Sequence, residues 1–256
     1  MNKTFCKKSN FINFMFAGCL ILFNVSCGLD VFYDIAAPYC NGELYYDNID
    51  ESEKYFLFTT AEPKNKEDSN YIGITFLGTE VYYKIYNSTS KLNSDVSSIN
   101  SYISNSTSAN LSVDRLTSIT YNYQPLRSFN DTGANILIEN KYSNRKIKIR
   151  LSSYHDEYLA GIDRLNDNGE VIESFGIPVR NLPNGNPNFN FREQKGTDLL
   201  PVGGDNADPD YAYTNTTEEI KQYYVALFAV AKGIDQNKIP QYSPATYLGS
   251  VTISLE

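Results

Sequence analysis

The sequence predicts a mostly β protein, and three observations support this class. The 256 residues include 21 tyrosines and 14 phenylalanines but no tryptophan, and aromatic and β-branched side chains favour strands over helices. Turn-forming Asn, Ser, Asp and Gly recur at short intervals. Several segments alternate between apolar and polar residues with a period of two, as strands with one buried face do.

The N-terminal segment predicts the compartment. Three lysines precede an apolar run from Phe11 to Val25, which is too short for the ~20 residues that a membrane-spanning helix needs. A basic start, a short apolar run and a small residue before the cut are typical of a secretory signal. We therefore expect residues 1–26 to be a signal peptide that ends at Ser26.

The first residue after this segment is a cysteine, and Val25-Ser26-Cys27 resembles the lipobox of bacterial lipoproteins. The resemblance implies a diacylglyceryl thioether on Cys27, and a protein with two or more acyl chains stays attached to a membrane. Cys19 is a second candidate, although cutting before it would leave apolar residues at the new N-terminus. The alternative is a plain cleaved signal or an uncleaved membrane helix, in which Cys27 has no role.

The remaining cysteine, Cys40, depends on the fate of Cys27. If Cys27 is acylated, Cys40 has no partner, and the fold rests on its hydrophobic core instead of a disulfide framework. If Cys27 stays free, a Cys27–Cys40 disulfide can form.

The charge of the chain argues against nucleic acid as a partner. The net charge is −8, with 22 basic and 30 acidic residues. Residues 1–26 hold three lysines and no acid, so the mature chain would carry −11. Binding a polyanion requires Lys and Arg to neutralise phosphates, and the one dense basic stretch, 145–150, is better explained as one face of a strand.

Four segments have the pattern of core strands: 55–60, 76–86, 223–231 and 247–255. In the second, Val81, Tyr83 and Ile85 share one face, and Glu80, Tyr82 and Lys84 share the other. Residues 223–231 are almost wholly apolar, which is typical of a strand that is covered on both faces.

Two of these segments resemble fibronectin type III domains. Gly78 to Lys84, GTEVYYK, is similar to the third strand of that family, and Tyr223 to Ser243 is similar to the sixth strand and the loop that follows it. The resemblance implies an immunoglobulin/fibronectin type III-like β-sandwich over residues 27–256, in which Tyr223 makes a corner hydrogen bond to the backbone. The second-strand tryptophan of the family has no counterpart here.

Residues 90–215 would then be a mixed, loop-rich insertion between the third and sixth strands, which builds out one end of the sandwich. Within it we expect a serine-capped helix over 94–103, a strand pair of 136–138 with 146–151, a hairpin turn at 166–169, and a long surface loop over 180–213.

No catalytic set is apparent, so we expect no enzyme. His155 is the single histidine, and no Gly-x-Ser-x-Gly elbow accompanies it. Asp205, Asp208 and Asp210 in a glycine-rich loop offer oxygen ligands that would suit calcium. A solvated acidic loop is the simpler interpretation, so no metal is expected.

Four tyrosines are candidates for a binding surface: Tyr121, Tyr123, Tyr211 and Tyr213. Each pair lies at i and i+2 in a segment that reads as exposed, and tyrosine is favoured where a surface binds protein or sugar. The commoner use of such tyrosines is packing in the core or on a sheet face.

Cys27-Gly28-Leu29-Asp30 followed by tyrosine-rich β structure resembles the surface lipoproteins of host-associated spirochaetes. We therefore expect a non-catalytic, extracytoplasmic lipoprotein of the bacterial cell envelope, anchored to a membrane by lipid on Cys27, without a cofactor, which presents the insertion for adhesion to a protein or glycan. The alternative is a small-solute or carbohydrate-binding lipoprotein with a pocket lined by Tyr and Asp. A concave pocket would favour that alternative, and a closed sandwich would disfavour it.

Overall fold

The computed structural model describes residues 35–40, 54–61, 73–105, 111–129, 136–152, 159–181, 191, 203–204 and 207–254. All of them belong to the unit Asp34–Glu256. Cys27, His155 and Asp205 lie outside the described residues, as does the expected signal segment. No helix among the described residues is long and apolar enough to cross a membrane.

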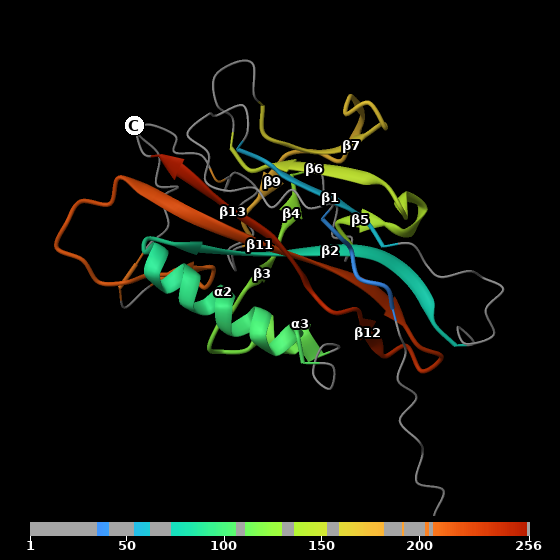
Figure 1. Cartoon of the computed structure of the whole chain (residues 1–256), viewed down its shortest axis with the longest axis horizontal. Helices are drawn as coiled ribbons and strands as arrows, with labels where there is room; N and C mark the ends of the chain where they lie inside the picture. Colours follow the sequence, from blue (N-terminus) through green and yellow to red (C-terminus); the bar gives the residue numbers. More distant parts are fainter. Residues whose placement is uncertain are drawn as a thin grey trace, which may run out of the picture. The chain divides into compact units, whose positions relative to one another are not determined.

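Three long strands form the centre of the larger sheet (Figure 1). Strand β2 (Thr75–Tyr86) pairs antiparallel with β11 (Gln222–Ile234), and β11 pairs antiparallel with β13 (Thr246–Ser254). The three strands predicted at these positions are confirmed. Short strands complete the sheet: β12 pairs with β11, and β3, β5 and β10 pair with β2. Their bounds are Pro240–Tyr242, Gln124–Pro125, Ile138–Glu139 and Tyr211–Ala212.

The smaller sheet is antiparallel, with the order β1-β6-β7-β8. Its strands are Phe56–Thr59, Lys146–Arg150, Gly161–Leu165 and Val171–Ser174. The predicted hairpin turn lies between β7 and β8, and Gly169 adopts the positive φ of 85° that such a turn requires. A separate two-stranded ribbon joins β4 (Arg127–Ser128) to β9 (Pro178–Val179).

One predicted strand pair is wrong. Residues 136–138 do not pair with 146–151, because β5 pairs with Gly78 and Thr79 of β2, and β6 lies between β1 and β7. Strand structure is found at Ile138–Glu139 and at Lys146–Arg150. Local sequence cannot choose among several partners of similar pattern, because pairing depends on which faces must be buried.

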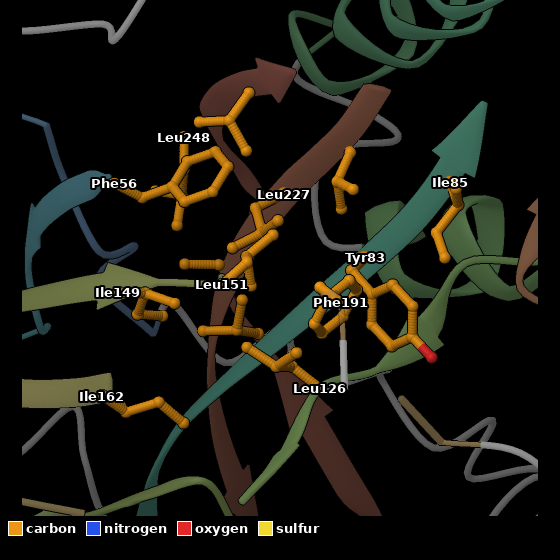
Figure 2. Packing of buried hydrophobic residues seen from close by; sticks show 14 of the residues in the cluster. Phe56, Tyr83, Ile85, Leu126, Ile149, Leu151, Ile162, Phe191, Leu227 and Leu248 are labelled. Atoms are coloured by element: carbon orange, nitrogen blue, oxygen red, sulfur yellow. The ribbon is translucent and has the colours of Figure 1, made fainter. Parts of the chain in front are cut away.

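The main core fills the space between the two sheets (Figure 2). Val81, Tyr83 and Ile85 of β2 lie in it, as their shared face predicts. Ile147, Ile149 and Leu151 also point inward, as predicted. The fold is therefore mostly β with antiparallel sheets, which is consistent with a β-sandwich.

The opposite face of the larger sheet is covered by helices (Figure 1). Helices α2 (Thr89–Ile103) and α3 (Ser112–Thr117) pack on it. A short 3₁₀ helix, η4 (Asn140–Tyr142), lies elsewhere, and its Tyr142 packs against the core between the sheets. Helix α2 is longer than predicted because it is capped at Ser88, whose Oγ accepts a hydrogen bond from the Lys91 amide at 3.3 Å. Leu92, Val96 and Ile99 form its buried stripe.

The segment 90–215 is more than an extension at one end. It supplies three of the four strands in the smaller sheet and the helical layer over the larger one. The expected surface loop over 180–213 is wrong at four of its described residues, since Arg180, Phe191, Asp210 and Tyr211 are buried. The physical reason is that β2 and β11 carry apolar side chains on both faces, and each face requires a cover.

Gly78 allows β5 to approach β2, and its replacement tests this contact. Its φ is +144°, and a Cβ there would lie 2.1 Å from the carbonyl oxygen of Ile138. We expect Gly78→Ala to lower the free energy of unfolding by at least about 3 kcal/mol. Gly169→Ala is the control, because its φ is also positive but open space surrounds it; it should cost about 1 kcal/mol. Equal losses in urea denaturation would contradict the steric account.

Candidate functional site

The four candidate tyrosines do not form an exposed surface. Tyr121, Tyr123 and Tyr211 are 6%, 1% and 4% exposed, and Tyr213 is half-buried. Tyr121 and Tyr123 pack beneath the helices, whereas Tyr211 and Tyr213 pack in or against the core between the sheets. The expectation of exposure is thus wrong for the three buried residues, because the sheet uses their rings to fill its two opposite faces.

The acidic loop is organised by a buried arginine. Arg180 Nε donates to Asp210 Oδ2 at 2.8 Å, and its Nη2 donates to Asp210 Oδ1 and Asp208 Oδ2 at 2.7 Å each. The side chains of Arg180 and Asp210 are 1% and 0% exposed, and that of Asp208 is 21% exposed. This bidentate geometry is the strongest that a guanidinium and a carboxylate can form.

Strand β2 joins the same network through Tyr83. Its hydroxyl donates to Asp210 Oδ2 at 2.7 Å and accepts the amide N–H of Asn181 at 2.7 Å. Burial and the Asp210 carboxylate raise the pKa of Tyr83 well above its ordinary value. Burial alone would lower the pKa of Arg180, but the hydrogen bonds and charge of Asp210 and Asp208 outweigh it and raise that pKa. Both groups therefore keep their protons in the folded protein.

These contacts correct the interpretation of the acidic loop. Asp210 is not solvated, because both of its carboxylate oxygens bind Arg180, and Oδ2 of Asp208 binds the same guanidinium. No group of three or more metal-ligating side chains occurs within the described ranges. Asp208 and Asp210 therefore act as partners of Arg180, and Asp205 lies outside the described residues.

Lys84 holds the same loop from the other face of β2. Its Nζ donates to the carbonyl oxygens of Pro209 at 2.9 Å and Asn122 at 3.2 Å. Burial lowers the pKa of Lys84 from its ordinary 10.5 to about 8, against the opposing pull of Asp210 and Asp95 and with a smaller lowering contribution from Lys91. Ile85 adds a backbone hydrogen bond to Asp210 at 2.9 Å. Residues 209–212 are thus fixed along one edge of β2.

This fixed segment leads directly into an open polar groove. Asn87 continues the pairing beyond β2, because its side chain donates to the Thr214 carbonyl at 2.7 Å and accepts the Thr214 amide at 2.8 Å. A hollow of about 1000 Å³ follows, between the start of α2 and the segment that leads into β11. Its lining comprises Asn87, Ser88, Thr89, Ser90, Thr214, Asn215, Thr216, Glu218, Glu219, Ile220, Lys221, Gln222 and Tyr224.

Most polar side chains of the groove are available to a ligand. Thr89, Ser90, Asn215, Glu218, Glu219 and Lys221 are exposed. Ser88 is used as the helix cap, and Thr216 Oγ1 accepts the Glu218 amide at 3.1 Å. In the first turn of α2 the Lys91 amide donates to Ser88 Oγ, whereas the Thr89 and Ser90 amides have no intrahelical acceptor and give this end of the groove hydrogen-bond donors.

The described chain enters the fold at the other end of the larger sheet. Ile35 is buried with Ala61 and Ala231, and its Cδ1 lies 3.3 Å from the place where a Cβ on Gly233 would be. Tyr39 pairs with Thr59 of β1. Because β2 has 12 residues, this entry and the groove are roughly 35 Å apart along the strands.

Neither a protein-family model, nor a curated protein, nor a solved structure matches this chain. The site is therefore interpreted from its own residues. Sequence reasoning missed Arg180, Lys84 and the groove. The only sequence signals were an arginine and aspartates placed in a loop otherwise rich in Pro and Gly, and the run Ser88-Thr89-Ser90, which forms the cap and the first residues of α2.

Removing Arg180 tests whether the buried network holds the fold. We expect Arg180→Met to lower the free energy of unfolding by about 3–5 kcal/mol, because it leaves the Asp210 carboxylate buried and unpaired. Adding Asp210→Leu should restore part of the loss. The control is Arg164→Met, whose partner Glu173 is about one-third exposed, and it should cost less than about 1 kcal/mol. A loss for Arg180→Met no larger than the control would contradict this account.

The lowered pKa of Lys84 predicts an alkaline gain in stability. Between pH 8 and about 10.5 the unfolded chain binds a proton at Lys84 that the folded chain does not, so the free energy of unfolding rises with pH. Relative to Lys84→Met, the wild type should gain about 2 kcal/mol from pH 7 to pH 10 in urea denaturation. Lys221→Met, at an exposed position, should show no such trend. A pH-independent difference between the wild type and Lys84→Met would overturn the prediction.

Proposed function

We propose that this chain is a non-catalytic, extracytoplasmic lipoprotein of the bacterial cell envelope that contacts a glycan or protein through the polar groove. The observation that carries the proposal is the placement of the groove. It lies at the end of the larger sheet opposite to the point where the described chain enters the fold.

A lipid anchor on Cys27 would orient the groove relative to the membrane. If Cys27 carries the lipid, Ile35 follows it by only eight positions, and eight residue steps reach at most about 28 Å. The entry end of the fold is then held close to the membrane, and the groove end is directed away from it. Residues that must meet an external ligand belong at such a distal end.

The finer fold type is part of the proposal. The order β2-β11-β13 supports an immunoglobulin/fibronectin type III-like fold, because the third, sixth and seventh strands of such domains are neighbours in one sheet. The smaller sheet departs from that family, since β6, β7 and β8 are consecutive hairpin partners. The lipobox-like Cys27 and the run Cys27-Gly28-Leu29 are the features that support a spirochaete-type surface lipoprotein.

The alternative of a small-solute-binding lipoprotein is less well supported. The space between the sheets is filled by packed side chains such as Tyr83, Leu227 and Phe191 (Figure 2). These side chains occupy the place where a solute would bind. The groove lies at the surface and is open, so it suits an exposed part of a larger ligand. Small solutes are usually bound in sites that bury most of their surface.

The anchor is tested by metabolic labelling of cells with a clickable fatty acid. We expect label on the wild type and on Cys19→Ala, and none on Cys27→Ala, because the lipid would be on the Cys27 thiol. Protease treatment of intact cells should remove the labelled domain if it faces outward. An unlabelled wild type, or undiminished label on Cys27→Ala, would refute the proposed anchor. A domain protected from protease would refute outward display.

A further inference from the structure

We propose that the groove binds an uncharged oligosaccharide. This inference rests on the proposed function, since it names the ligand class of the same groove. Its basis is the combination of hydrogen-bonding groups that the two walls present to one space.

The two walls have complementary hydrogen-bonding character. One wall is the start of α2, where the hydroxyls of Thr89 and Ser90 and the backbone N–H groups of these two residues offer donors. The other wall carries the carboxylates of Glu218 and Glu219 with the amide of Asn215. A sugar ring with neighbouring hydroxyls can donate to the carboxylates and accept from the amide and helix groups at once. Tyr224, half-buried at the base of β11, adds an aromatic ring that can stack on the apolar face of a sugar.

The charges of the groove favour a neutral ligand. Glu218 and Glu219 face one ammonium, Lys221, and the partial positive charge of a helix N-terminus. The local balance is therefore slightly negative, as is the chain as a whole with its net charge of −8. Sulfated or sialylated glycans would meet repulsion. A neutral glycan meets no such repulsion, and it can bind both the hydrogen-bond donors and the hydrogen-bond acceptors of the groove.

The groove also suits a glycan better than a protein. Protein interfaces depend on a central cluster of buried aromatic and aliphatic anchors. Here Ile220 and Tyr224 are the lining residues with large apolar side chains, and the others are polar. The Asn87–Thr214 hydrogen bonds and the network around Asp210 hold the start of the second wall in place, which reduces the ordering required on binding.

The test is binding of the full chain, purified in detergent, to an array that carries neutral oligosaccharides beside sulfated and sialylated ones. We expect binding to neutral members only. Glu218→Gln/Glu219→Gln should weaken it by at least about tenfold, since hydrogen bonds to charged acceptors are lost. Ser90→Tyr should also weaken it by filling the groove. The matched control removes two exposed carboxylates elsewhere, Asp114→Asn/Asp167→Asn, and should bind as the wild type does. All variants should melt at the wild-type temperature, because every position is exposed.

Three results would overturn the inference. They are binding that prefers anionic glycans, neutral binding that both groove variants retain, and no binding to any oligosaccharide. A photo-crosslinker placed at position 90 on intact cells separates these failures from failure of the proposed function. A crosslink to a protein would overturn the oligosaccharide assignment while keeping the groove as the contact site. The absence of both a crosslink and glycan binding would overturn the oligosaccharide assignment and the groove as the contact site.

Discussion

The described structure depends most on the buried ion pair between Arg180 and Asp210. These residues are 30 positions apart, and the pair is bidentate and excluded from solvent. Burying two charges is costly unless their geometry is good and their remaining atoms are hydrogen-bonded. Tyr83 and Asp208 meet that condition. The result is a fixed course for residues 208–214 along the edge of β2, from which the second wall of the groove starts.

The second constraint is that both faces of the larger sheet carry apolar side chains and must be buried. On β2, Val81, Tyr83 and Ile85 face the smaller sheet, while Tyr82 and Tyr86 face the helices. The same holds for β11, where residues 225–231 are buried throughout. Most of both covers comes from the long segment between these strands, and β1 adds one strand to the smaller sheet. This explains why the segment contributes strands and helices to the fold, and why Glu80 and Lys84 are buried with partners at Lys232 and Pro209.

The molecule therefore has two different ends. At one end an apolar cluster around Ile35 receives the incoming chain. At the other, the strand ends, the α2 N-terminus and residues 214–222 leave a hollow that is mostly polar. Such a hollow forms because short polar residues at a helix start and in a turn cannot fill the space that apolar side chains fill elsewhere. The proposed anchoring at the first end and the proposed recognition at the second are compatible with each other, because the length of the larger sheet separates them.

The sequence by itself determined the strands over 55–60, 76–86, 223–231 and 247–255, the hairpin turn at Gly169 and the helix over 94–103. These follow from side-chain periodicity and backbone preference, which act over a few residues. The pairing of β5, the burial of Tyr121, Tyr123 and Tyr211, the Arg180–Asp210 pair and the groove were decided only by the tertiary structure. Each of these depends on which distant segments meet, and a tyrosine or aspartate in a loop has the same local pattern whether it ends in solvent or in the core.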